Sequence, residues 1–230
     1  MLFFLEKQDF GFEYCIIEIG SVICYDYPEV ICMLNMIRGC RIQDPSLLFE
    51  GYEHTSFGLV ANVNADRIQT LFEEFIRLHN SRCFVILEVP TNSKEEPDLM
   101  TNKAPSFHKD VYYMDGLTAE RAIEFLRVFG EWVIHDGLSN FGIGIHSGNH
   151  EMILDKYNVV TIYTKTPQMY DNFFQIHNLN RVTDLKSAWD FFTPECPGES
   201  FLYEYKGNNI YDIIEYLKQY GLYFAERREV

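Results

Sequence analysis

The chain has 230 residues, of which 47% are hydrophobic and 16% aromatic, a composition that excludes an intrinsically disordered protein. Its 34 acidic residues outnumber its 19 basic residues, giving a formal net charge of -15 that repels nucleic-acid phosphates and anionic lipid. We therefore expect a packed protein with no nucleic-acid or membrane partner. Its acidity serves either solubility or the attraction of a basic protein partner.

The cysteines show neither the C-x-x-C motif nor the Cys/His spacing of metal sites. Several lie in apolar runs, where cysteine behaves as a small hydrophobic residue, so we interpret them as free thiols in a reducing cytoplasm. The opening MLFFLEKQDF lacks the basic region and the long apolar core of a signal peptide. No run approaches the roughly 18 apolar residues that a membrane-spanning helix needs. The sequence predicts a cytoplasmic protein without metal or cofactor.

The first part of the chain predicts strands alternating with helices. Residues 3–25 are typical of an edge element and a strand, and Pro28 then begins a short helix, 29–38, that Gly39 ends. A regular β-α-β unit follows, with alternating apolar residues in its strands and apolar residues at helical spacing between them. Its elements are a strand at 57–63, a helix at 65–78 with Asn64 as N-cap, and a strand at 83–89.

Residues 90–105 are rich in Pro, Asn, Lys and Glu, which marks a surface loop or a subdomain boundary. Because the pattern recurs after this segment, we expect one domain spanning residues 1–230. The later elements are a strand at 110–114, a helix at 119–134 with Thr118 as N-cap, strands at 141–146 and 159–163, a helix at 168–177, a short helix at 185–192, a strand at 201–205, a helix at 210–220 and a strand at 222–226.

The order of these elements predicts the fold class. Recurring β-α-β units with polar alternation in the strands indicate an α+β fold, with a mixed or mainly antiparallel sheet and helices packed on one face. The four longer helices should each pack on a sheet that contains the six best-defined strands.

The densest group of reactive side chains follows the strand FGIGI, in SNFGIGIHSGNHEMILDKYNVVTIYT, which we interpret as two strands joined by a polar loop. His146 and His150 lie four residues apart, but Ser-Gly-Asn between them disfavours the helix that would aim both at one metal ion, so no metal site is predicted. His135 and Asp136 could form an acid/base pair with Glu151 if the loop folds back. A cationic histidine at a helix C-terminus explains the same residues without catalysis.

Motifs for nucleophilic catalysis and phosphate binding are missing. No serine lies in a G-x-S-x-G elbow, and Gly142, Gly144 and Gly148 lie in or after a strand without the strand-to-helix turn that cradles phosphate. These glycines favour close packing or bulges within a sheet. We therefore predict that the protein is not an enzyme.

Tyrosines are numerous for a single domain, and they either line the rim of the core or form a surface for a basic protein, with carboxylates supplying electrostatic steering. Those of surface type are Tyr112, Tyr113, Tyr157, Tyr203, Tyr205, Tyr211, Tyr216, Tyr220 and Tyr223. The candidate partner-binding residues around the loop are Asp136, His146, His150, Glu151, Asp155 and Tyr157.

Two stretches, FGIGIHSGNHEMILDKYNVVTIYT and AWDFFTPECPGESFLYEYKGNNIYDIIEYLKQYGLYFAERRE, resemble the C-terminal half of immunity proteins that accompany bacterial polymorphic or contact-dependent toxins. The resemblance covers about residues 110–229 and rests on the FG-x-G strand, the KYN-x-x-x-IY run and the closing G-x-Y-x-AE pattern. It implies a binder without catalysis that occludes the active site of a toxin.

The sequence thus favours an acidic immunity protein that neutralises a basic toxin domain such as a nuclease. A small hydrolase or transferase that uses His146, His150, Glu151 and Asp136 is the alternative among enzymes. An adaptor module of a larger assembly is the third interpretation.

Overall fold

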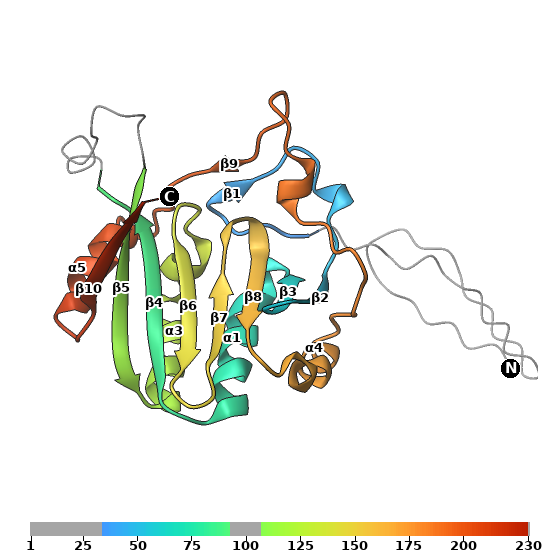
Figure 1. Ribbon diagram of the computed structural model, residues 1–230. Coiled ribbons are helices and arrows are strands. Elements are labelled where there is room, and N and C mark those ends of the chain that lie inside the picture. Colours follow the sequence, from blue (N-terminus) through green and yellow to red (C-terminus); the bar gives the residue numbers. More distant parts are fainter. Residues whose placement is uncertain (1–33, 93–106, 230) are drawn as a thin grey trace, which may run out of the picture. The chain divides into compact units, whose positions relative to one another are not determined.

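The computed structural model describes residues 34–92 and 107–229 (Figure 1). The strand expected at 3–25 and most of the segment 90–105 lie outside these ranges. The expected helix at 29–38 falls inside them only at its end, where residues 34–38 are not helical. The N–H of Ile37 donates to Asn158 Oδ1 at 2.8 Å, so this backbone is tied to a distant element instead of to its own preceding turn.

An eight-stranded sheet forms the centre of the described part, in the order β10-β5-β4-β6-β7-β8-β3-β2. Its strands are β2 (Gly51–Thr55), β3 (Gly58–Asn62), β4 (Cys83–Pro90), β5 (His108–Leu117), β6 (Asn140–Ile145), β7 (His150–Leu154), β8 (Val159–Tyr163) and β10 (Tyr223–Glu229). Every neighbouring pair is antiparallel. The expected α+β fold with a mainly antiparallel sheet is confirmed. A second, two-stranded sheet joins β1 (Cys40–Arg41) to β9 (Glu199–Ser200).

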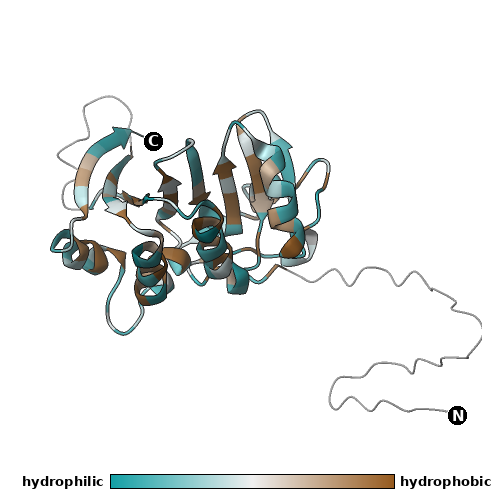
Figure 2. Ribbon diagram, turned by 90° about the horizontal axis from the view of Figure 1, so that it is seen from below, coloured by the Kyte–Doolittle hydropathy of each residue, from teal (hydrophilic) through white to brown (hydrophobic). Residues whose placement is uncertain are grey.

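Three helices lie on one side of the large sheet, as Figure 2 shows. They are α1 (Ala65–His79), α3 (Ala119–His135) and α5 (Ile210–Lys218). Thr118 caps α3 as expected, because its Oγ1 accepts the N–H of Arg121 at 3.4 Å. Asn64 precedes α1 but uses its side chain elsewhere, accepting the N–H of Asn35 at 3.0 Å. The apolar faces of these helices are buried against the sheet.

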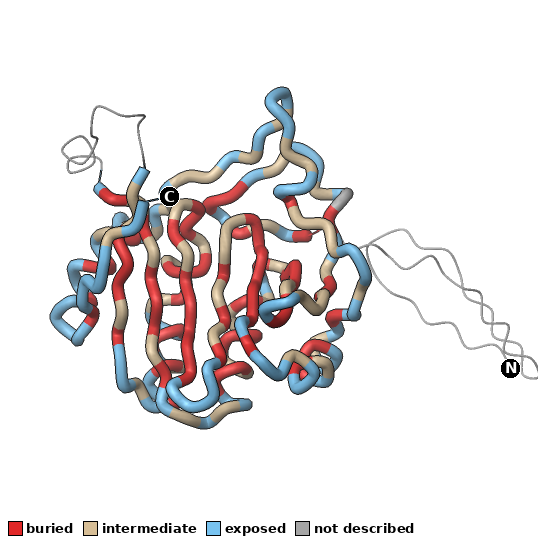
Figure 3. Tube along the Cα trace, in the orientation of Figure 1, coloured by how far each residue is buried: buried red, intermediate tan, exposed pale blue. Residues whose placement is uncertain are grey.

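Strand alternation separates the two faces of the sheet. The side chains that face α1 and α3 join one hydrophobic core, which includes Leu59, Ala61, Val85, Leu87, Phe141, Ile143, Met152, Leu154, Val160 and Ile162. Ile86, Val111 and Val159 are buried as well, but they alternate with these residues and do not belong to that core. Buried positions concentrate in the central strands, whereas β10 at the edge is largely exposed (Figure 3).

Several predicted elements differ from those observed. The region 139–163 contains three strands where we expected two, because Gly148 and Asn149 have positive φ and close a tight turn before β7. Residues 201–205 are not a strand of either sheet, since the N–H groups of Phe201 and Tyr203 donate to Gly39 O and Asp136 Oδ1. The strand β2 was also not expected.

The shorter helices are reduced from their predicted lengths. The expected helix at 168–177 is a 3-10 turn, η3 (Pro167–Tyr170), followed by α4 (Asp171–Ile176). The expected helix at 185–192 is the single turn η4 (Ala188–Phe191).

The strands on either side of residues 93–106, β4 and β5, pair with each other, and all described residues belong to one compact unit, residues 32–230. Within the described ranges no helix combines the length and the apolar character that crossing a membrane requires.

Candidate functional site

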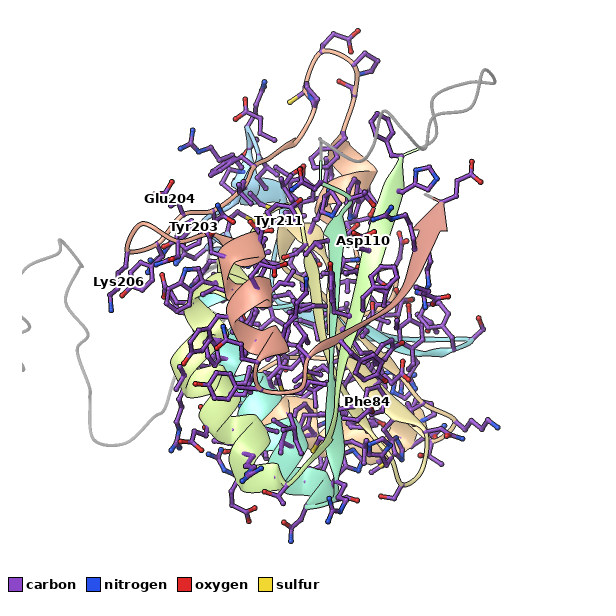
Figure 4. All side chains as sticks on the ribbon, turned by 90° about the vertical axis from the view of Figure 1, so that its left-hand side faces the viewer. Phe84, Asp110, Tyr203, Glu204, Lys206 and Tyr211 are labelled. Carbon is purple, nitrogen blue, oxygen red and sulfur yellow. The ribbon has the colours of Figure 1, made fainter. Side chains whose placement is uncertain are left out.

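The face of the sheet turned away from α1, α3 and α5, here called the open face, points toward the viewer in Figure 1. Figure 4 shows Phe84 on the side of the strands opposite α5 and Tyr211. Strand alternation determines which side chains this face carries, because a residue and its cross-strand partner point to the same side. Starting from Phe84, the register assigns Glu151, Tyr163, Tyr113 and Tyr223 to the same face.

Aromatic rings cross one half of the open face on adjacent strands. The rings of Phe84 and Tyr113 have centroids 5.9 Å apart, and those of Tyr113 and Tyr223 are 6.4 Å apart. His146, in the turn between β6 and β7, extends the series, with its ring centroid 5.0 Å from that of Phe84. This half is therefore a continuous aromatic surface.

Gly144 allows the Phe84 ring to lie against the backbone of β6. A Cβ at Gly144 would come 2.0 Å from Cζ of Phe84, which no side chain can occupy. Gly142 plays the same part for Ile153, whose Cδ1 would lie 2.2 Å from an added Cβ. The close packing expected of these glycines is confirmed, and it lets the side chains of Phe84 and Ile153 lie against the backbone of β6.

A carboxylate and two further rings continue the series on the other half. Glu151 pairs across the strands with Gly144 on one side and with Tyr163 on the other. The ring of Tyr163 lies 5.4 Å from that of Phe57, and the two residues are 43% and 47% exposed. We call Tyr223, Tyr113, Phe84, Glu151, Tyr163 and Phe57 the docking row.

Charges on the open face are unequally compensated. Glu88 is paired with Arg228 at 3.0 Å and lies 3.8 Å from Lys109. Asp115 accepts the hydroxyl of Tyr223 at 2.5 Å. Glu151, by contrast, forms no ion pair with any residue in the described ranges, so its charge is available to a partner.

Two titratable groups at the upper end of the open face, Asp155 and Tyr163, have raised pKa values. Burial raises the pKa of Asp155 to about 6, with Lys109 opposing the shift and Glu88 adding to it. Burial also raises the pKa of Tyr163, and the negative charges of Asp155, Glu88 and Glu151 raise it further. An incoming positive charge would relieve this repulsion.

The structure divides the predicted partner-binding residues into two groups. His146, Glu151 and Asp155 lie on the open face or at its end. Asp136, His150 and Tyr157 are only 2%, 9% and 3% exposed, and this burial excludes their side chains from a docking surface.

Each buried member of this set is held by its surroundings. Asp136 accepts the N–H groups of Leu138, Ser139 and Tyr203 at 3.1, 2.8 and 2.9 Å. Tyr157 has its ring centroid 5.0 Å from that of Trp189. Asp136 and Tyr157 therefore stabilise the loops around them.

The predicted acid/base group does not assemble. Asp136 lies at the end of α3, and its carboxylate accepts hydrogen bonds from backbone N–H groups, whereas Glu151 faces the other side of the sheet. His146 and His150 are also divided between the two faces, since His146 contacts Phe84 and His150 contacts the buried Tyr170. Across residues 34–92 and 107–229, no cluster of three or more His, Cys, Asp or Glu side chains could hold a metal ion.

The sequence interpretation missed three members of the docking row, namely Phe57, Phe84 and Tyr163. Alternation within 83–89 places Phe84 opposite the apolar positions Cys83 and Val85, which is a readable signal for a second face. Its flat packing needs Gly144 from a strand 60 residues later in the chain, which no local pattern shows.

Searches with this chain against protein-family models, curated proteins and solved structures return no match.

Proposed function

We propose that the protein is a non-catalytic binding protein that docks a basic protein partner on its open face. The resemblance to immunity proteins supports a bacterial toxin domain as this partner, with the active site of the toxin covered in the complex. The observation that carries the proposal is the docking row, in which exposed and half-buried aromatic rings lie on both sides of Glu151, a carboxylate without an ion pair among the described residues. Aromatic residues are enriched at the energetic centres of protein interfaces.

The two kinds of side chain would have different roles in such a complex. Tyr163 and Phe57 offer large, half-exposed rings that bury area while losing few rotamers. Glu151 would pair with a lysine or arginine of the partner, and this pairing would add orientation to the attraction exerted by the net charge of -15. The rings would thus control how long the complex lasts, and the carboxylate how fast it forms.

Surface-plasmon kinetics with the toxin domain encoded beside this gene would test the proposal. Glu151→Lys should slow association by about tenfold, and the slowing should shrink as salt screens charges beyond a Debye length of about 8 Å. Glu124→Lys is the matched control, because Glu124 is exposed on α3, on the opposite side of the sheet. Equal slowing by both substitutions would show that only the overall charge matters and would contradict docking on the open face.

Truncation of a ring tests the other role. Tyr163→Ala should raise the dissociation rate by about tenfold or more and leave association nearly unchanged. Tyr220→Ala is its control, since Tyr220 is 62% exposed beyond the end of α5. A Tyr163→Ala complex that dissociates at the original rate would place the interface elsewhere.

A further inference from the structure

Two histidines share one buried tyrosine hydroxyl beneath the open face. The hydroxyl of Tyr170 lies 2.8 Å from Nε2 of His79 and 3.0 Å from Nδ1 of His150. The two imidazole rings have centroids 4.6 Å apart, and Tyr170 is fully buried. The three residues come from the end of α1, the start of β7 and η3, so they join segments that are distant in the sequence.

The surroundings of this cluster contain no compensating charge among the described residues. Thr164 Oγ1 lies 3.0 Å from Nδ1 of His150. The ring centroid of Phe75 lies 4.9 Å from that of His79, and the ring centroid of Phe173 lies 5.9 Å from that of Tyr170. Burial and the neighbouring His150 lower the pKa of His79 to about 4, and burial lowers the pKa of His150. Among the described residues, the charged neighbour of Tyr170 along the chain is Asp171, whose carboxylate is engaged by the Tyr52 hydroxyl and by His54 Nε2.

Proton counting shows why the cluster is sensitive to acid. When both histidines are neutral, the Tyr170 hydroxyl can donate its single proton to one ring nitrogen and accept from the other. When both are protonated, both nitrogens become donors, and the hydroxyl proton loses its acceptor. Two like charges then face each other across 4.6 Å in a buried site. Full protonation is therefore incompatible with this packing.

The cluster directly supports half of the docking row. His150 precedes Glu151 in the chain, and Thr164 follows Tyr163. Strand alternation therefore places the side chains of His150 and Thr164 on the face of the sheet opposite to those of Glu151 and Tyr163. The N–H of Thr164 also donates to the carbonyl of Phe57 at 3.1 Å. Any displacement of His150 or Thr164 must move the backbone that carries Glu151, Tyr163 and Phe57.

We propose that His79, Tyr170 and His150 form an acid-sensitive latch that fixes this half of the docking row at neutral pH and releases it on protonation. The proposal rests on the proposed function of the open face. Protonation would loosen the start of β7 and the end of β8, and a bound basic partner would dissociate faster. The complex would thus persist at neutral pH and separate in an acidic environment.

The direction of the pH effect on stability follows from the lowered proton affinity. The unfolded chain takes up protons on these histidines below about pH 6.5, whereas in the folded protein the pKa of His79 falls to about 4 and that of His150 is lowered by burial. Stability contributed by the neutral cluster is complete above pH 6.5 and is lost as the pH falls toward 4. The pKa of Asp155 is raised from 3.8 to about 6 in the folded protein, so protonation of Asp155 stabilises the fold as the pH falls between these two values. Only a comparison between variants therefore isolates the effect of the histidines.

Urea unfolding of the full chain at about pH 7 and about pH 5 would test the latch without any partner. Between these conditions the unfolding equilibrium constant of the unmodified protein should rise about tenfold more than that of a His79→Gln/His150→Gln variant. His146→Gln should behave like the unmodified protein, because the His146 side chain is 46% exposed. An equal pH dependence in the double variant and the unmodified protein would overturn the latch.

A titration of the unmodified protein covers the case in which the double variant does not fold. Nuclear magnetic resonance of the imidazole carbons should show His79 protonating near pH 4 and His150 protonating below the ordinary range of a histidine. An ordinary titration of either ring near pH 6.5 would overturn the proposal.

Partner dissociation is the final measurement. The complex with the neighbouring toxin domain should dissociate faster at about pH 4, where His79 becomes protonated, than at about pH 7, and the double variant should lose this difference. If that toxin domain fails to bind at pH 7, the proposed function is wrong, and the unfolding data still decide whether the latch exists.

Discussion

Single glycines determine the shape of the open face, and the atoms above each one set the cost of replacing it. Above Gly144 lies the rigid ring of Phe84, with three ring carbons within 2.5 Å of the position of an added Cβ. Above Gly142 the nearest atom is Cδ1 of Ile153, the flexible end of an aliphatic side chain. A methyl group added at Gly144 thus requires the whole Phe84 ring to move, whereas one added at Gly142 requires only a rotation of the Ile153 side chain.

Gly144→Ala should lower the free energy of unfolding by about 2 kcal/mol, since overpacking forces the Phe84 ring off the strand. Gly142→Ala should cost less, about 1 kcal/mol or below, because Ile153 can change rotamer. Urea denaturation monitored by tryptophan fluorescence measures both. Equal losses would mean that the Phe84 ring moves as freely as the Ile153 side chain.

Among the elements, β10 is held at the edge of the sheet by a partly buried ion pair. Arg227 donates from Nε to Asp110 Oδ1 at 2.5 Å and through a second nitrogen to Oδ2 at 3.0 Å. Thr91 Oγ1 donates to the same carboxylate at 2.9 Å. Because Asp110 is buried, loss of the arginine would leave a carboxylate without its charge partner.

Arg227→Leu should therefore destabilise the protein by about 3 kcal/mol, whereas the neighbouring Arg228→Leu should cost less than about 1 kcal/mol because Arg228 is more exposed. Adding Asp110→Asn to Arg227→Leu should recover part of the loss. A double-mutant cycle in urea provides the numbers. Similar effects of the two arginine substitutions would show that the pair contributes little to holding β10.

The predictability of each element follows from how local its causes are. The helices α1 and α3 and the strand β4 are readable because their own apolar spacing matches the buried face. The FLYEY run at 201–205 alternates like a strand, yet its N–H groups are claimed by Gly39 O and by Asp136 Oδ1, acceptors from distant parts of the chain. The polar loop led to Glu151, which lies on the open face, but the burial of Asp136 depends on contacts that no local pattern contains.

At the scale of the whole molecule, the net charge of -15 opposes folding while favouring a basic partner. Raising sodium chloride from about 10 mM to about 150 mM shortens the Debye length from roughly 30 Å to roughly 8 Å. The melting temperature of the isolated protein should rise by a few degrees, because self-repulsion weakens. Association with a basic partner should slow over the same range. Differential scanning calorimetry in a salt series checks the first effect, and a fall in melting temperature would mean that attractive ion pairs outweigh the repulsion.

The strand order also determines when the open face can exist during synthesis. β3 pairs with β8 and β5 pairs with β10, so Phe57 and Tyr223 enter one surface from segments that the ribosome releases far apart in time. Contacts between distant segments form slowly, and a chain released only to β8 lacks β10, the strand that pairs with the outer edge of β5. A nascent chain would therefore carry an incomplete docking row. Binding at the docking row would therefore be a property of finished molecules and not of those still being translated.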